Sequence, residues 1–197
     1  MSLRTETDVA VIPTEATPER LDFHQTIRRS TRPCHDEVDA LFGQFDLADR
    51  SAYADFLSAH AAALIPVEEW LQLASLGLPA SPRSNALRVD LLALGRPQPA
   101  FNPLTWPNRE ADRWGAAYVI EGSRLGGAML LRNVPQDYPR AYLGSVHPSG
   151  NWRAFLAALQ TRANEGGSSW QEDALVAAQR TFTLYRDSAI AMGATLG

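Results

Sequence analysis

The sequence predicts an all-α protein with a single domain. Apolar residues recur at the three- and four-residue spacing of amphipathic helices, and the alternating, β-branched runs typical of strands are nearly absent. A chain of 197 residues is long enough for one substantial core and too short for two domains of ordinary size. We therefore expect one helical domain at residues 19–197, preceded by a disordered N-terminal tail at residues 1–18.

The helices follow from the apolar periodicity and from the positions of proline. The first helix opens with a capping residue followed by Pro18. Either this helix kinks at Pro33, or Thr31 caps a new helix with Pro33 in its first turn, and both alternatives place His35 on a helix. The expected helices span residues 18–42, 51–76 with a kink at Pro66, 82–94, 109–132, 152–162 and 168–192, with a proline-rich loop at 95–107.

Composition excludes several classes of protein. No apolar run reaches the roughly 18 residues of a membrane span, and the N-terminus lacks the basic patch and apolar core of a secretory signal, so a cytoplasmic location is expected. The single cysteine, Cys34, excludes an internal disulfide framework and a multi-cysteine metal cluster. With a net charge of -4 and no basic run, nucleic acid is not an expected partner.

The first segment with chemical potential runs from Ile27 to His35. Arg28, Thr31 and Arg32 precede His35 by seven, four and three residues, which places all four on one helical face. A neutral imidazole is a good axial ligand for haem iron, and arginine pairs well with the propionate carboxylates of haem. The alternative is a solvated, arginine-rich helix that carries a surface or partly buried histidine.

The second segment, from Tyr118 to Ala128, places three glycines inside a strong helical pattern. Each glycine costs a helix roughly 1 kcal/mol relative to alanine. Gly122 and Gly126 are four residues apart, so they remove the side chains from one stripe and let a flat ligand or another helix approach the backbone. Close helix packing alone would also use such a stripe. The two segments together favour a planar cofactor, because one offers a ligand and the other a bare surface.

These two motifs together resemble those of haem oxygenases, especially the bacterial type associated with bacteriophytochromes. The resemblance extends over about residues 21–192 and rests on Arg28-x-x-Thr31-x-x-x-His35 and Glu121-Gly122-Ser123-x-Leu125-Gly126-Gly127. It implies a helical bundle that holds haem between a proximal helix and a distal helix kinked at its glycines. It also implies oxidative cleavage of haem to biliverdin, CO and Fe2+ with O2 and reducing equivalents, so that haem is both cofactor and substrate.

The resemblance further implies a role for each motif residue. His35 would be the proximal iron ligand, and Gly122, Ser123 and Gly126 would form the catalytic distal surface. Animal-type members carry aspartate where this chain has Ser123, which leaves the distal water network open. The expected haem-binding residues, which include two arginines for the propionates and a third at the end of the distal helix, are Arg28, Thr31, Arg32, Tyr118, Gly127 and Arg132.

The other histidines are weaker candidates. His24, eleven residues before His35, is the rival ligand if the first helix is continuous. His60 lies in an apolar helix, where we expect a hydrogen-bonded core histidine, and no distal histidine stands out. His147 lies in a loop rich in proline and glycine and is expected to face solvent.

Three other functions stay open. Ser123 and the absence of lysine keep a non-catalytic haem-binding or haem-trafficking protein as the main alternative. An enzyme of the related thiaminase-like fold would need Cys34 as its nucleophile. Glu68 and Glu69 could suggest a di-iron site, but no histidine follows a glutamate at the required spacing. For the haem oxygenase we expect a monomer, an electron donor such as ferredoxin, and a phytochrome as recipient of biliverdin.

Overall fold

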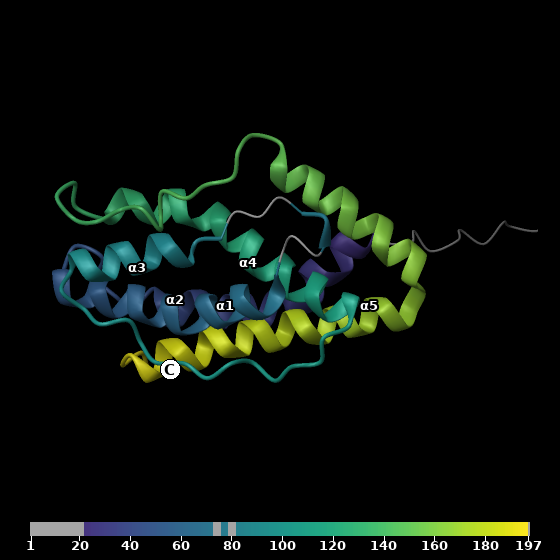
Figure 1. Ribbon diagram of the computed structural model, residues 1–197, viewed down its shortest axis with the longest axis horizontal. Coiled ribbons are helices and arrows are strands. Elements are labelled where there is room, and N and C mark those ends of the chain that lie inside the picture. Colours follow the sequence, from purple (N-terminus) through teal and green to yellow (C-terminus); the bar gives the residue numbers. More distant parts are fainter. Residues whose placement is uncertain (1–21, 73–75, 79–81, 197) are drawn as a thin grey trace, which may run out of the picture.

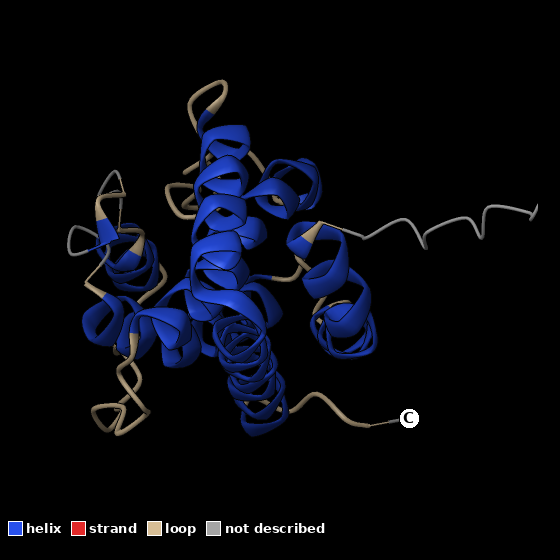
Figure 2. Ribbon diagram, turned by 90° about the vertical axis from the view of Figure 1, so that its right-hand side faces the viewer, coloured by secondary structure: helices blue, strands red, loops and turns tan. Residues whose placement is uncertain are grey.

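The computed structural model describes residues 22–72, 76–78 and 82–196. Over these residues the chain forms helices and loops without any strand, as Figure 2 shows, which confirms the all-α, single-domain prediction. The expected tail at residues 1–18 lies outside the described residues. Within the described ranges, no helix combines the length and the apolarity needed to cross a membrane.

The helices lie close to their predicted positions (Figure 1). Their bounds are α1 Phe23–Phe42, α2 Arg50–Leu71, α3 Ser84–Ala93, α4 Glu110–Leu130, the short 3-10 helix η2 Leu131–Asn133, and α5 Asn151–Ala191. α5 bends sharply at Gly167, whose φ of 68° and ψ of -164° are not helical. Its two arms therefore correspond to the two separate helices that the sequence predicts in this region.

The structure decides between the two alternatives at Pro33 and corrects the predicted end of α2. α1 passes through Pro33 as one helix, and Thr31 does not cap a new one, because its hydroxyl donates to the carbonyl of Ile27 at 2.7 Å within the same helix. α2 ends at Leu71 instead of Leu76, because the next residue, Gln72, has a left-handed backbone with φ 46°.

α5 is the element against which the other long helices pack. α1, α2 and α4 all lie against it, whereas α1 and α4 make few contacts with one another. The approach of α4 to α5 is closest at Gly115, where a Cβ atom would lie 2.0 Å from the carbonyl oxygen of Ala174. Only glycine permits this crossing. The close helix packing that small residues allow on α4 therefore occurs at Gly115.

Gly115→Ala should lower the free energy of unfolding by about 1–3 kcal/mol, because its methyl group forces α4 and α5 apart. Gly126→Ala is the matched control, since a Cβ atom at Gly126 meets no atom within 4 Å. That change should raise stability by up to about 1 kcal/mol through helix propensity. Urea unfolding of both variants measures the difference, and equal stabilities would contradict the assigned crossing.

Candidate functional site

One side of α1 faces α4 and the second arm of α5. The ring of His24 lies 6.3 Å from that of Tyr118 on α4, and the ring of His35 lies 5.9 Å from that of Phe182 on α5. Burial raises the pKa of Tyr118, and the nearby charge of Arg28 opposes that rise. His24, Arg28 and His35 therefore line one side of α1, as the helical spacing predicts.

Two carboxylates lie near one ring nitrogen of His35. Its side chain is 53% exposed, and its Nδ1 lies 3.3 Å from Oδ2 of Asp39 and 3.8 Å from Oδ1 of Asp36. A carboxylate beside Nδ1 favours the tautomer that carries its hydrogen there, which leaves the Nε2 lone pair available to a metal. The structure gives Nε2 no hydrogen-bond partner among the described residues.

The remaining residues of the predicted α1 face have different surroundings. Arg28 is exposed, and Arg32 is exposed but donates from Nε to both carboxylate oxygens of Asp36 at 2.7 and 2.8 Å. Thr31 is buried in the core. Of the expected propionate partners on this helix, Arg28 is therefore the one without a carboxylate partner among the described residues.

The three glycines of the predicted distal segment differ in what lies over them. A Cβ atom at Gly122 would meet Trp152 at 3.5 Å, which is an ordinary contact, and one at Gly126 would meet nothing within 4 Å. At Gly127 it would lie 2.9 Å from the carbonyl oxygen of Leu143. The bare backbone is thus explained by protein packing at Gly127 and is open at Gly126.

Ser123 points toward residues on the other side of α4. Its hydroxyl donates to the carbonyl of Ile120 at 2.8 Å and accepts a hydrogen bond from Nη2 of Arg83, also at 2.8 Å. The guanidinium of Arg83 lies over the ring of Tyr142, 5.2 Å from its centroid. Ser123 is therefore part of a polar cluster that α4 shares with residues before α3 and after η2.

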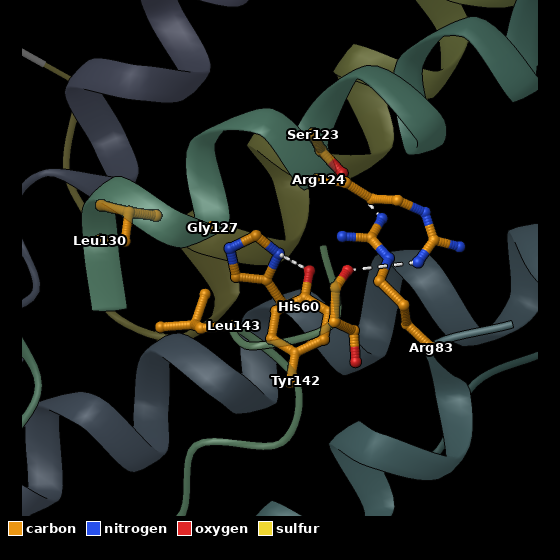
Figure 3. Close-up of a pocket in the computed structure, with 9 residues that line it drawn as sticks. His60, Arg83, Ser123, Arg124, Gly127, Leu130, Tyr142 and Leu143 are labelled. Atoms are coloured by element: carbon orange, nitrogen blue, oxygen red, sulfur yellow. Dashed lines mark hydrogen bonds between the residues drawn. The ribbon is translucent and has the colours of Figure 1, made fainter. Parts of the chain in front are cut away.

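His60 belongs to the same cluster, which the sequence does not reveal. Its Nδ1 lies 2.8 Å from the hydroxyl of Tyr142, so the prediction of a hydrogen-bonded core histidine is confirmed. It also lines a small cavity with Ser123 and Gly127, as Figure 3 shows, so the fold does bring a histidine to the distal helix. Burial, and then the charge of Arg83, lower the pKa of His60 to about 3.

The structure contradicts the expectation that His147 faces solvent. Its side chain is 11% exposed, and Nε2 lies 2.9 Å from the backbone oxygen of Glu121. The carboxylate of Glu121 pairs in turn with Arg124 at 2.9 Å. The loop after η2 folds back onto α4, which buries a histidine that its loop composition would leave in water.

The other candidate residues stabilise the fold or lie apart from the site. Glu68 accepts hydrogen bonds from the backbone N–H groups of Arg83 and Ser84 and from the Ser84 hydroxyl, so it caps α3. Within the described ranges, no group of three or more His, Cys, Asp or Glu residues could hold a metal ion. Cys34 is a partly buried free thiol, and Arg132 is exposed in η2.

Comparison with known proteins places the chain in a family. No family model matches it. A haem oxygenase of Xanthomonas campestris pv. campestris is 36% identical over 146 residues, which cover 68% of this chain and 86% of the relative. The chain belongs to the haem oxygenase family. The haem oxygenase PigA of Pseudomonas aeruginosa is 29% identical over 153 residues, covering 68% of this chain and 76% of PigA. The resemblance predicted from the two motifs is thereby confirmed.

Solved haem oxygenases share the fold. The NO- and CO-bound enzyme of Neisseria meningitidis superposes with a TM-score of 0.74 at 24% identity, covering 87% of this chain and 92% of that one. The enzyme of Leptospira interrogans gives a TM-score of 0.61 at 18% identity, over 86% and 98% of the two chains. The helical arrangement described above is therefore the haem oxygenase fold.

The low pKa of His60 predicts a loss of stability in acid. The folded imidazole stays neutral down to about pH 3, whereas the unfolded one binds a proton below about 6.5. Above pH 6.5 both states leave His60 neutral, so its burial does not lower the free energy of unfolding. As the pH falls below 6.5, proton binding favours the unfolded state, and the free energy of unfolding falls by about 2 kcal/mol between pH 7 and 5. Urea unfolding at both pH values should show His60→Gln losing less stability than the wild type, and equal losses would contradict the burial of a neutral His60.

Proposed function

We propose that this member of the haem oxygenase family cleaves haem oxidatively to biliverdin, CO and Fe2+, using O2 and reducing equivalents. The observation that carries the proposal is the pairing of two features on facing helices. His35 presents an unpartnered Nε2 on α1, and α4 carries Gly126, over which the protein leaves its backbone uncovered. A flat iron-containing ring needs an imidazole on one side and a surface without side chains on the other.

The residues around His35 and Gly126 fit haem. Asp39 Oδ2 lies 3.3 Å from Nδ1 of His35, and Arg28 lies on the same side of α1, where its guanidinium is exposed and suited to a propionate carboxylate. Tyr118 and Trp152, whose rings lie 6.0 Å apart, provide an apolar wall beside Gly122. Arg32, Thr31, Gly127 and Arg132 complete the haem-binding set that the resemblance implies.

When bound, haem supplies both the iron that activates O2 and the carbon that is oxidised. The chain contributes binding and orientation. His35 would hold the iron, Arg28 would pair with a propionate, and Gly122 and Gly126 would keep the distal side free of bulky groups. The Ser123 hydroxyl, hydrogen-bonded to Arg83 and to the Ile120 carbonyl, lies on the same turn of α4.

The biological setting follows from the same resemblance. We propose ferredoxin or a similar reductant as the electron donor, and a phytochrome as recipient of the biliverdin. We also propose that the protein acts in the cytoplasm, which its single cysteine supports, and as a monomer, which the family resemblance implies.

Hemin titration of His35→Ala tests the assignment of the ligand. The wild type should bind hemin stoichiometrically with a sharp Soret band, and that band should decay to a biliverdin spectrum when a ferredoxin system or ascorbate supplies electrons in air. His35→Ala should lose the axial bond and the decay, whereas the control His24→Ala should keep both. Binding without decay would instead favour a haem carrier, and equal behaviour of His35→Ala and wild type would overturn the assignment.

Gly126→Leu tests whether the bare stripe is a binding surface. The added side chain enters space that the protein does not occupy, so the free energy of unfolding should not fall. It should block the ring, however, and lower hemin affinity at least about tenfold, which corresponds to about 1.4 kcal/mol. Ala128→Leu adds the same side chain at an exposed position of α4 and should leave affinity unchanged. A wild-type affinity for Gly126→Leu would remove Gly126 from the site.

A further inference from the structure

Two large apolar side chains of α4 are exposed on either side of Gly126 in the sequence. Leu125 is 52% exposed and Met129 is 69% exposed. They are four residues apart, so they are neighbours on the helix surface. Gly126 is exposed as well, and a Cβ atom there would meet no atom within 4 Å. Apolar groups gathered at such an open position are typical of a surface that a ligand covers.

The helical spacing places Met129 at one end of the glycine stripe. Each residue turns an α-helix by about 100°, so Met129, seven residues after Gly122, returns to within about 20° of it. Tyr118, four residues before Gly122, lies within about 40° of the same direction. Tyr118 and Met129 therefore bound the stripe at its two ends, about 16 Å apart along the helix. A porphyrin with its substituents spans a similar length.

The thioether of Met129 is accessible to an oxidant dissolved in water. Oxidation converts a methionine thioether to a sulfoxide, and an exposed sulfur is attacked more readily than a covered one. The other methionine of the described chain, Met192 at the end of α5, is partly buried and packs against the core. The two residues thus offer the same chemistry with different access, and only Met129 lies on the stripe with Gly122 and Gly126.

We propose that Met129 is a modification site, which hydrogen peroxide formed from O2 at the bound haem oxidises to the sulfoxide. The inference rests on the proposed function, which brings O2 and electrons to this stripe. Peroxide forms when O2 takes up two electrons from the reductant and two protons from water. Its O–O bond then breaks, one oxygen is added to the sulfur of Met129, which loses two electrons, and the other oxygen leaves as water with both hydrogens.

The sulfoxide weakens the binding of the next haem. Oxidation replaces a flexible apolar side chain by a polar one. Against the ring, the sulfoxide oxygen would lose its water without gaining a hydrogen bond, because the neighbouring Leu125 and Gly126 offer no side-chain donor. Peroxide released during turnover would therefore limit further haem uptake, and a sulfoxide reductase would reverse the effect.

The position of Met129 at the stripe can be measured without turnover. Dilute hydrogen peroxide added to the haem-free protein should oxidise Met129 before Met192, as followed by mass spectrometry of peptides. Gallium protoporphyrin has the shape of haem and does not reduce O2. Its binding should slow the oxidation of Met129 several-fold and leave that of Met192 unchanged. Equal oxidation of Met129 with and without this porphyrin would overturn the proposal.

The second measurement follows Met129 during turnover of the hemin-loaded protein. A ferredoxin system supplies electrons in air, and catalase removes any peroxide that escapes into solution. Sulfoxide should accumulate at Met129 as biliverdin forms, Met192 should stay a thioether, and neither should change without O2. Biliverdin formation with an unmodified Met129, or equal oxidation of both methionines, would overturn this inference alone. Failure of the wild type to bind hemin or to form biliverdin would instead refute the proposed function.

Met129→Leu is the matched variant, because leucine has a similar volume and cannot be oxidised. Untreated, it should bind hemin as the wild type does. After treatment with peroxide and removal of the excess, the wild type should bind hemin about tenfold more weakly, whereas Met129→Leu should keep its affinity. Both proteins carry Met192, so the difference reports on position 129. A methionine sulfoxide reductase should restore the wild type, and equal affinities after treatment would overturn the effect on haem uptake.

Discussion

The close crossing of α4 over α5 at Gly115 is the constraint on which the arrangement of the site depends. With a Cβ position only 2.0 Å from the carbonyl oxygen of Ala174, the two backbones meet without an intervening side chain. Because α1 also packs on α5, one helix sets the positions of both walls of the site. α1 and α4 contact one another little, and the rings of His24 and Tyr118 lie 6.3 Å apart between these two helices. A binding region between two helices can stay open only if a third holds them.

The wall behind α4 is built by groups that come from elsewhere in the chain. Asp90 of α3 captures the backbone at Tyr142, Tyr142 contacts His60 of α2, and His147 contacts the backbone of Glu121. Each of these polar groups is largely withdrawn from water and finds a partner, as burial requires. The loop between η2 and α5 is consequently a structural part of the distal side, because its polar groups fasten it to three helices.

The sequence predicts those features that depend on neighbours in the chain. Helical spacing places His35 and Arg28 on one side of α1, and the glycine pattern identifies the stripe on α4. It could not distinguish Gly126, which is open, from Gly127, which lies under the Leu143 carbonyl, because that contact comes from a loop. The burial of His147 and the pairing of His60 with Tyr142 join residues 26 and 82 positions from their partners. Periodicity carries no information about such contacts. The polar, proline-rich composition of its loop predicted an exposed His147, and that prediction is wrong.

The hydrogen bonds of Ser123 decide which role its hydroxyl can take on α4. A hydroxyl has a single hydrogen, and that of Ser123 is given to the carbonyl of Ile120, while Arg83 donates to its oxygen. Ser123 can thus accept a further hydrogen bond but cannot donate one. The hydrogen of the Ser123 side chain is thus committed to its own helix. His60, which lies 2.8 Å from the Tyr142 hydroxyl, and the guanidinium of Arg83 line the same cavity as Ser123.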